Sequence, residues 1–122
     1  MLFRSERIAN TDPLTGLASR AVLARVLEHE LARAGRQGTE VSLAIFDLDG
    51  FKAINASAGR EAGDRALQEV AAVIAGTVRM VDTVARAGAD EFAVVAPGAG
   101  ATIVARRIMD AIGRAEIGRA HV

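Results

Sequence analysis

Four carboxylates stand in two short clusters that a small fold could bring together. Asp47 and Asp49 directly follow the apolar run 41–46, while Asp90 and Glu91 lie between two further apolar runs. On adjacent strands, these clusters would offer the oxygen ligands that a hard divalent cation requires. Magnesium is usually held by one or two carboxylates, and substrate phosphates and water complete its coordination. The pattern predicts metal-assisted phosphate chemistry, although Asp47 and Asp49 alone would more often mark a solvated strand end.

A lysine and an amide accompany the carboxylates. Lys52 is the only lysine in the chain, and at three residues after Asp49 it would place a point charge beside a bound phosphate. Asn55 and Asp64 flank a segment that contains glycines, and an amide with a carboxylate can hydrogen-bond the edge of a purine. Taken singly, Lys52 also fits an ordinary surface lysine, and the other two also fit helix caps.

Composition excludes several other kinds of chemistry. The chain has 122 residues, no cysteine and two histidines, His29 and His121, so it has no thiolate metal site and little with which to bind zinc. Fifteen basic residues balance fifteen acidic ones and Trp and Tyr are absent, so no nucleic-acid partner is expected. No apolar run approaches the roughly 20 residues that span a bilayer. We expect one cytoplasmic domain with no signal peptide.

Periodicity and punctuation predict an α/β sandwich in which helices cover a small sheet. Helices are expected over about 20–34, 51–55 and 64–78 and around 103–112, and strands over 41–46, 83–86 and 91–96, the last two forming a tight hairpin. Three strands are few for such a sheet. The apolar positions expected to face inward are Val22, Leu23, Val26, Leu27, Leu31, Leu67, Val70, Ala71, Ile74, Ile103, Val104, Ile108, Met109 and Ile112.

Four blocks of sequence form one ordered pattern. They are D-P-L-T-G-L at 12–17 with Arg20, F-D-L-D-G-F-K-A-I-N at 46–55, glycines at 59 and 63 followed by Asp64, and R-A-G-A-D-E-F at 86–92. In order and spacing they resemble the GGDEF domain family, the diguanylate cyclases, over about residues 12–113. The resemblance implies an α+β fold related to adenylyl cyclase and polymerase palms, with the signature hairpin at the edge of the active site.

The resemblance also implies a reaction. Two GTP molecules, one on each of two domains that face each other across a two-fold axis, would condense to cyclic di-GMP and release two pyrophosphates. Each domain supplies half of the site, so turnover would require a homodimer. Mg²⁺ or Mn²⁺ would serve as cofactor, because in-line attack on an α-phosphate depends on positioning and on charge neutralisation. An upstream sensory or receiver domain is implied as well.

The resemblance assigns metal and catalytic roles to four residues. Asp47 and Asp90 would hold the metal ions, with the Leu48 carbonyl nearby. Glu91 would assist deprotonation of the attacking 3′-hydroxyl or support the metal. Asp90 and Glu91 are therefore the candidate catalytic residues, and Asp47, Leu48 and Asp90 the candidate metal ligands.

The resemblance assigns substrate contacts to five more residues. Lys52 would contact the phosphates, and Asn55 and Asp64 would read guanine. Gly88 would let the backbone approach the nucleotide closely, and the neighbouring Ala89 would lie beside it. All five belong to the predicted GTP site.

An R-x-x-D pattern precedes the signature. Arg79 stands nine residues before Gly88 and Asp82 follows Arg79 by three. This is the spacing at which the family places its inhibitory site for cyclic di-GMP, where an arginine fork could bind phosphate or guanine and a carboxylate could accept from guanine. The alternative is a salt bridge at a helix end.

Several positions depart from the family pattern. The second glycine of the signature is Ala89, and if the turn requires a positive φ there, a Cβ would cost on the order of 1 kcal/mol and crowd the nucleotide. The usual residues are also replaced at Ser19, Ala56 and Arg60. The alternative function is therefore a degenerate or truncated domain that binds GTP or cyclic di-GMP without turnover.

The ends of the chain carry separate predictions. Residues 1–10 resemble the end of an upstream connecting helix, and residues 11–115 resemble a GGDEF domain that lacks the family's last strands, a helix and a phosphate-binding Lys/Arg pair. Residues 116–122 look like a translated sequencing adapter. A fragment of this kind is expected to be inactive alone and to expose apolar surface that favours aggregation.

Overall fold

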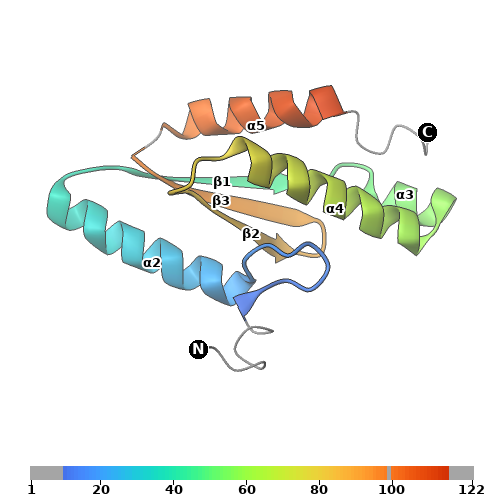
Figure 1. Cartoon of the computed structure of the whole chain (residues 1–122), viewed down its shortest axis with the longest axis horizontal. Coiled ribbons are helices and arrows are strands. Elements are labelled where there is room, and N and C mark those ends of the chain that lie inside the picture. The colour runs from blue at the N-terminus through green and yellow to red at the C-terminus, as the bar shows by residue number, and fades with distance from the viewer. Residues whose placement is uncertain (1–9, 99, 116–122) are drawn as a thin grey trace.

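A three-stranded antiparallel sheet in the order β1-β3-β2 separates the helices into two layers (Figure 1). The structure is a computed structural model and describes residues 10–98 and 100–115. Helices α4 and α5 cover one face of the sheet, and α2 lies on the other (Figure 1). The elements are α2 (Arg20–Gln37), β1 (Val41–Asp47), α3 (Phe51–Ala58), α4 (Arg60–Thr77), β2 (Thr83–Gly88), β3 (Glu91–Pro97) and α5 (Ala101–Ala115).

This arrangement confirms the predicted fold class and the order of its elements. The sequence-based predictions for residues 1–9 and 116–122 lie outside the described residues. β2 and β3 form the expected hairpin, with β2 extending to Gly88 so that the turn consists of Ala89 and Asp90 alone. β1 pairs with β3 rather than with β2, which places the end of β1 beside the hairpin turn.

The main core lies between α4, α5 and one face of β3. All four positions of α4 that were predicted to face inward are buried, because they recur at the helical period along one side. Phe92 and Val94 of β3 contribute alternate side chains to the same core, and Ile108 contributes from α5. The buried residues of this cluster are Leu67, Val70, Ala71, Ile74, Phe92, Val94 and Ile108.

Local capping sets the ends of α2 as the sequence predicts. The Ser19 hydroxyl accepts a hydrogen bond from the Val22 amide at 3.3 Å, which satisfies a free donor in the first turn. Gly38 ends the helix in the left-handed conformation at φ 68°, and its amide donates to the Ala34 carbonyl. The helix therefore runs to Gln37, three residues beyond the predicted end.

The prediction that α4 begins at Asp64 after a loop containing Gly63 is wrong. The helix begins at Arg60, and Gly63 is a buried residue inside it. Gly59 alone reverses the chain between α3 and α4, because it adopts φ 90°, which favours glycine. Gly63 serves packing instead: a Cβ there would collide with the Asn55 side chain of α3.

Three apolar positions predicted to face inward do not. Leu31 of α2 is 55% exposed, and Ile103 and Met109 of α5 are 63% and 64% exposed. Leu43 and Ile45 of β1 are also exposed. The reason is the width of the sheet: β1 is an edge strand and α2 lies mainly against β2 and β3, so the helices extend beyond the surface that three strands offer.

The helices are amphipathic rather than uniformly apolar. In the part of the chain that the structure describes, no helix is both long and apolar enough to cross a membrane.

Substitutions in α4 and α5 should separate the core from the exposed helix face. Leu67→Ala removes a fully buried side chain, so we expect the free energy of unfolding to fall by about 2–5 kcal/mol. Met109→Ala, at an exposed position, should change it by less than about 0.5 kcal/mol. Urea unfolding followed by circular dichroism measures both. A loss at Met109 as large as that at Leu67 would contradict the packing of α5 described above.

Candidate active site

The end of β1 and the β2–β3 turn lie side by side and bring the two carboxylate clusters together. Asp47 pairs with Glu91 across the β1–β3 ladder, so both side chains project from the same face of the sheet. Asp90 precedes Glu91 in the turn. Asp47 and Asp90 line a hollow of about 380 Å³, together with Asp49 and Lys52.

The electrostatics of this hollow favour a cation. Like charges directly opposite each other on paired strands destabilise a sheet. Asp47 and Glu91 form such a pair, and neither makes an ion pair within the described residues. Those residues contain no group of three or more His, Cys, Asp or Glu side chains arranged to hold a metal. Mg²⁺ needs only one or two carboxylates when a substrate supplies phosphate oxygens, so the hollow fits that ion together with a nucleotide.

Backbone contacts fix the hollow's geometry. The Leu48 amide donates to the Asp90 carbonyl at 2.9 Å, which ties the turn to the end of β1. The Leu48 carbonyl accepts from the Phe51 amide at 3.3 Å, at the start of α3, and retains a second lone pair. Lys52 follows in the first turn of α3 with an exposed side chain. The turn, the end of β1 and the start of α3 therefore form three sides of one site.

The α3–α4 contact contains an unsatisfied polar atom. Asn55 Oδ1 is buried and has no hydrogen-bond partner within the described residues, which normally costs free energy. It lies against Gly63, and Asp64 is the next residue of α4, half-buried. Asn55 is three residues after Lys52, so the two lie on neighbouring helical positions about 4.5 Å apart along the axis. An external donor at this contact would satisfy the amide oxygen.

Glycine at position 88 is not required by the packing of the described chain. A Cβ there would lie 3.4 Å from the Glu91 Cβ, at the edge of ordinary contact. Ala89, which follows it, contributes its carbonyl to a hydrogen bond from Arg86 Nη2 at 2.7 Å.

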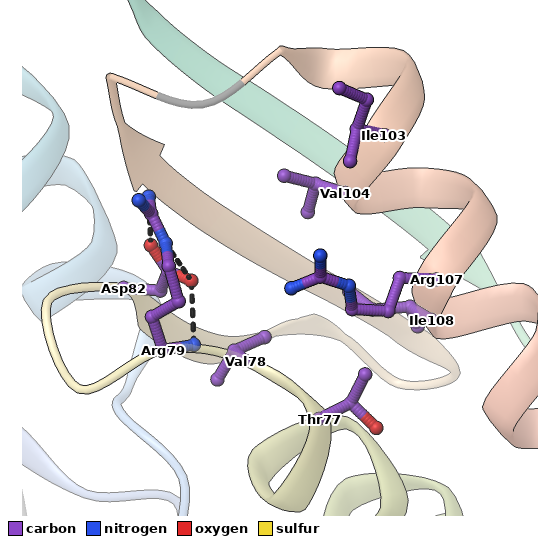
Figure 2. Close-up of a pocket in the computed structure, with 8 residues that line it drawn as sticks. All are labelled: Thr77, Val78, Arg79, Asp82, Ile103, Val104, Arg107 and Ile108. Carbon is purple, nitrogen blue, oxygen red and sulfur yellow. Dashed lines mark hydrogen bonds and ion pairs between the residues drawn. The ribbon is translucent and has the colours of Figure 1, made fainter.

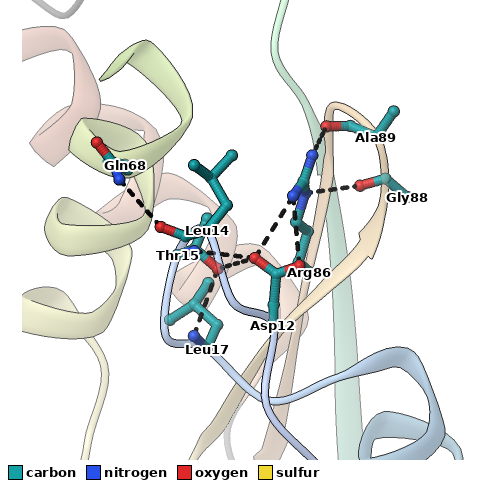
Figure 3. Close-up of polar contacts among 8 residues, drawn as sticks. All are labelled: Asp12, Leu14, Thr15, Leu17, Gln68, Arg86, Gly88 and Ala89. Atoms are coloured by element: carbon teal, nitrogen blue, oxygen red, sulfur yellow. Dashed lines mark hydrogen bonds and ion pairs between the residues drawn. The ribbon is translucent and has the colours of Figure 1, made fainter. Parts of the chain in front are cut away.

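An ion pair that sequence reasoning gave no role supports the turn from the opposite side (Figure 3). Arg86 Nη1 lies 3.3 Å from Asp12 Oδ1, between residues 74 positions apart. Asp12 also accepts from the Thr15 hydroxyl at 2.7 Å and the Thr15 amide at 2.9 Å. Burial alone would raise the pKa of Asp12, but the bonds from Thr15 and the Arg86 charge outweigh it and hold the pKa below 3.8.

A second cavity, of about 120 Å³, lies at the far end of β2 (Figure 2). Arg79 Nη2 pairs with Asp82 Oδ1 at 2.8 Å and donates to the Pro97 carbonyl at 2.7 Å. This is the helix-end salt bridge that the sequence allowed as an alternative. Arg107 reaches from α5 toward the same cavity and makes no hydrogen bond or ion pair with the described residues. Sequence reasoning missed Arg107, because only the packing of α5 beside the 79–82 turn places it there.

A comparison with protein families identifies the architecture. The family described as "Diguanylate cyclase, GGDEF domain" matches residues 9–119. The chain belongs to the GGDEF family. Diguanylate cyclase DgcP of Pseudomonas aeruginosa is 46% identical over 89 residues, 73% of this chain and 13% of DgcP. Response regulator PleD of Caulobacter vibrioides is 37% identical over 121 residues, 99% of this chain and 25% of PleD.

Solved GGDEF structures share the fold. The GGDEF domain of DgcB from Caulobacter crescentus, crystallised in complex with c-di-GMP, matches with a TM-score of 0.81 and 35% identity, over 91% of this chain and 61% of that chain. The GGDEF chain described here thus spans a quarter or less of the two curated relatives, and under two thirds of the DgcB domain.

The lowered pKa of Asp12 predicts a pH-dependent contribution to stability. Because the folded-state pKa lies below 3.8, the ionised carboxylate stabilises the fold above that pH, and the contribution is lost as the pH falls through the lowered value. The difference in unfolding free energy between the wild type and Asp12→Asn should therefore be largest near neutral pH and shrink below about pH 4. Asp110→Asn, at an exposed position of α5, is the control. A difference that stays constant under acidification would contradict this assignment.

Proposed function

We propose that this chain is the GGDEF domain of a diguanylate cyclase, which condenses two GTP molecules to cyclic di-GMP and releases two pyrophosphates. The observation that carries the proposal is the convergence of Asp47, Asp49 and Asp90 at one hollow beside Lys52, with Glu91 paired to Asp47 across the β1–β3 ladder. Unpaired carboxylates with one cation at their rim suit a nucleoside triphosphate bound with a divalent metal. The name of DgcP supports the same reaction.

The proposed metal ligands are the carboxylates of Asp47 and Asp90 and the carbonyl of Leu48. They would hold Mg²⁺ or Mn²⁺, whose charge would offset that of the triphosphate and of the leaving pyrophosphate. Lys52 would contact the phosphates from the first turn of α3, where its exposed side chain can reach the rim of the hollow.

Guanine is proposed to bind at the α3–α4 contact. The buried Asn55 Oδ1 lacks a donor, and the N–H groups on the Watson–Crick edge of guanine would provide one. Asp64 would accept from the same edge, since guanine presents two adjacent donors there and adenine does not. Gly88 and Ala89 would lie beside the nucleotide, which would give Gly88 a role that the chain's own packing does not require.

In the proposed reaction, the 3′-hydroxyl of one GTP attacks the α-phosphorus of the other. A P–O bond forms to the 3′-oxygen, the bond to the β-phosphate oxygen breaks, and pyrophosphate leaves. Glu91, opposite Asp47 in the β1–β3 ladder, is proposed to accept the hydroxyl proton. The second ester forms in the same way with the two GTP molecules exchanging roles.

The symmetry of that reaction defines the proposed partners. One hollow supplies one GTP, so a second copy of the chain must face it across a two-fold axis. The name of PleD, a response regulator, supports a sensory or receiver domain elsewhere in the same protein. Because GTP is a cytoplasmic nucleotide, the proposal places the domain in the cytoplasm.

Asp90→Ala tests the proposed reaction. Because residues 11–115 alone are expected to be inactive, the test uses the domain within a full-length cyclase. With GTP and Mg²⁺, the wild type should form cyclic di-GMP, and the variant should lose at least about 100-fold in rate because a metal ligand at the reacting phosphates is gone. Chromatography with mass detection measures product and pyrophosphate. Asp110→Ala, exposed and remote on α5, should retain the wild-type rate. Undiminished product formation by Asp90→Ala would overturn the proposed role.

The second cavity favours another candidate function, namely binding of cyclic di-GMP without turnover. Arg79 and Arg107 place two guanidinium groups at one small cavity, and paired arginines suit a phosphodiester. Asp82 is only 3% exposed and holds Arg79 in place through three hydrogen bonds. The DgcB domain, crystallised with c-di-GMP, supports this ligand class.

Arg79→Ala tests this second candidate. We expect the variant to lose at least about tenfold in affinity for cyclic di-GMP, because a charge-assisted contact to phosphate or guanine is removed. Isothermal titration calorimetry measures the affinity, and Arg65→Ala, exposed on α4, is the matched control. Equal affinities for the wild type and Arg79→Ala would exclude this cavity as the binding site.

A further inference from the structure

The guanidinium of Arg86 forms hydrogen bonds to other residues of the chain through all three of its nitrogens. Its Nε donates to the Gly88 carbonyl at 3.2 Å, its Nη2 to the Ala89 carbonyl at 2.7 Å, and its Nη1 approaches both Asp12 oxygens at 3.3 and 3.4 Å. The side chain is 19% exposed. An arginine whose three nitrogens are all engaged by the protein suits the support of a backbone rather than the capture of a phosphate.

The two carbonyls that Arg86 binds belong to Gly88, the last residue of β2, and to Ala89, the first residue of the turn. The β2–β3 pairing is irregular between Arg86 and Gly88, where the register shifts. An irregularity of this kind leaves backbone groups without their ladder partners. The planar guanidinium donates hydrogen bonds in two directions at once and in a fixed geometry. A lysine ammonium on its flexible side chain would not hold the two carbonyls in that geometry.

Asp12 orients the guanidinium and is itself firmly held. Its carboxylate accepts both bonds from Thr15, and its amide donates to the Leu17 carbonyl at 2.8 Å. The Leu14 carbonyl accepts from Gln68 of α4 at 3.1 Å, so the 12–17 loop is also attached to the core helix (Figure 3). Arg86 therefore connects the turn to a loop that a further hydrogen bond joins to α4.

The turn is attached on its other side as well. The bond from the Leu48 amide to the Asp90 carbonyl, 2.9 Å, ties it to the end of β1. Arg86 acts on residues 88 and 89 from the β2 side, and Leu48 acts on residue 90 from the β1 side. Residues 88–90 are thus held by two hydrogen bonds from Arg86 on β2 and by one from the Leu48 amide, just after β1.

We propose that Arg86, oriented by Asp12, is a positioning residue of the active site: it fixes the backbone of residues 88–90 and so the place of the Asp90 carboxylate at the hollow and of the Glu91 carboxylate opposite Asp47. Its effect on the backbone is independent of the proposed function, whereas its effect on metal binding rests on that function. The residue is not catalytic, since its donors are engaged by the chain itself.

The test compares Arg86→Lys with Arg65→Lys in the whole chain. Arg86→Lys keeps the positive charge opposite Asp12 but loses the paired N–H donors of the guanidinium. Arg65 is exposed on α4 and makes no hydrogen bond or ion pair within the described chain. Amide hydrogen exchange by NMR measures how often the hydrogen bond from the Leu48 amide to the turn opens, with the buried Leu67 amide as reference. Mn²⁺ affinity with and without GTP, measured by water-proton relaxation, reports the hollow.

We expect Arg86→Lys to accelerate exchange at Leu48 about tenfold with Leu67 unchanged, and to weaken Mn²⁺ binding by a similar factor. Arg65→Lys should change neither. Unaltered Leu48 exchange in Arg86→Lys would overturn the inference, even if Mn²⁺ binding fell in the presence of GTP, because the residue would then act on the bound nucleotide rather than on the turn. If the wild-type protein binds no Mn²⁺ but Arg86→Lys still accelerates exchange at Leu48, the inference stands and the proposed function is contradicted.

Should Arg86→Lys fail to fold, Asp12→Asn provides the same test. It leaves the guanidinium in place but removes the charge that orients it, so exchange at Leu48 should rise by a smaller factor in the same direction. No change at Leu48 in Asp12→Asn would overturn the inference as well.

Discussion

The antiparallel pairing of β1 with β3 sets the positions of Asp47, Asp90 and Glu91, the acidic residues to which the metal and catalytic roles are assigned. Its register sets Asp47 opposite Glu91, and the hydrogen bond from the Leu48 amide to the Asp90 carbonyl extends that pairing into the turn. Two carboxylates in register on one face repel each other, and the sheet bears this cost because the strands are held together by the buried residues behind them. A bound cation would relieve this repulsion, so the pairing of Asp47 with Glu91 supports the chemistry proposed.

A similar conflict occurs at the contact between α3 and α4. Gly63 lets the two helices approach so closely that a Cβ would collide with Asn55, and the approach buries an amide oxygen that has no partner within the described residues. Both features reduce stability, the first through the helix propensity of glycine and the second through desolvation. They are understandable if the amide oxygen receives a hydrogen bond from a ligand, which the proposed guanine would donate.

β2 joins the two places where a ligand is proposed. Asp82 precedes the strand at one end and Gly88 ends it at the other, about 20 Å away for six extended residues. At both ends an arginine is already paired with an aspartate: Arg79 with Asp82, and Arg86 with Asp12. The two pairs differ in exposure. Arg79 is 43% exposed and can meet a ligand, whereas Arg86 is largely enclosed and is engaged with the turn.

The sequence by itself determined the elements and the family, because both depend on local patterns. The helical period of α4, the Ser19 cap and the apolar runs of β1 and β3 each carry their signal within a few residues, and the signature blocks are contiguous. Tertiary structure decided the rest. Leu31 and Met109 have the periodicity of core residues, yet they are exposed because the width of the sheet is not encoded locally. The burial of Asn55, the approach of Arg107 to Arg79 and the bond between Asp12 and Arg86 all join separate segments, and contacts of that kind exist only once the chain has packed.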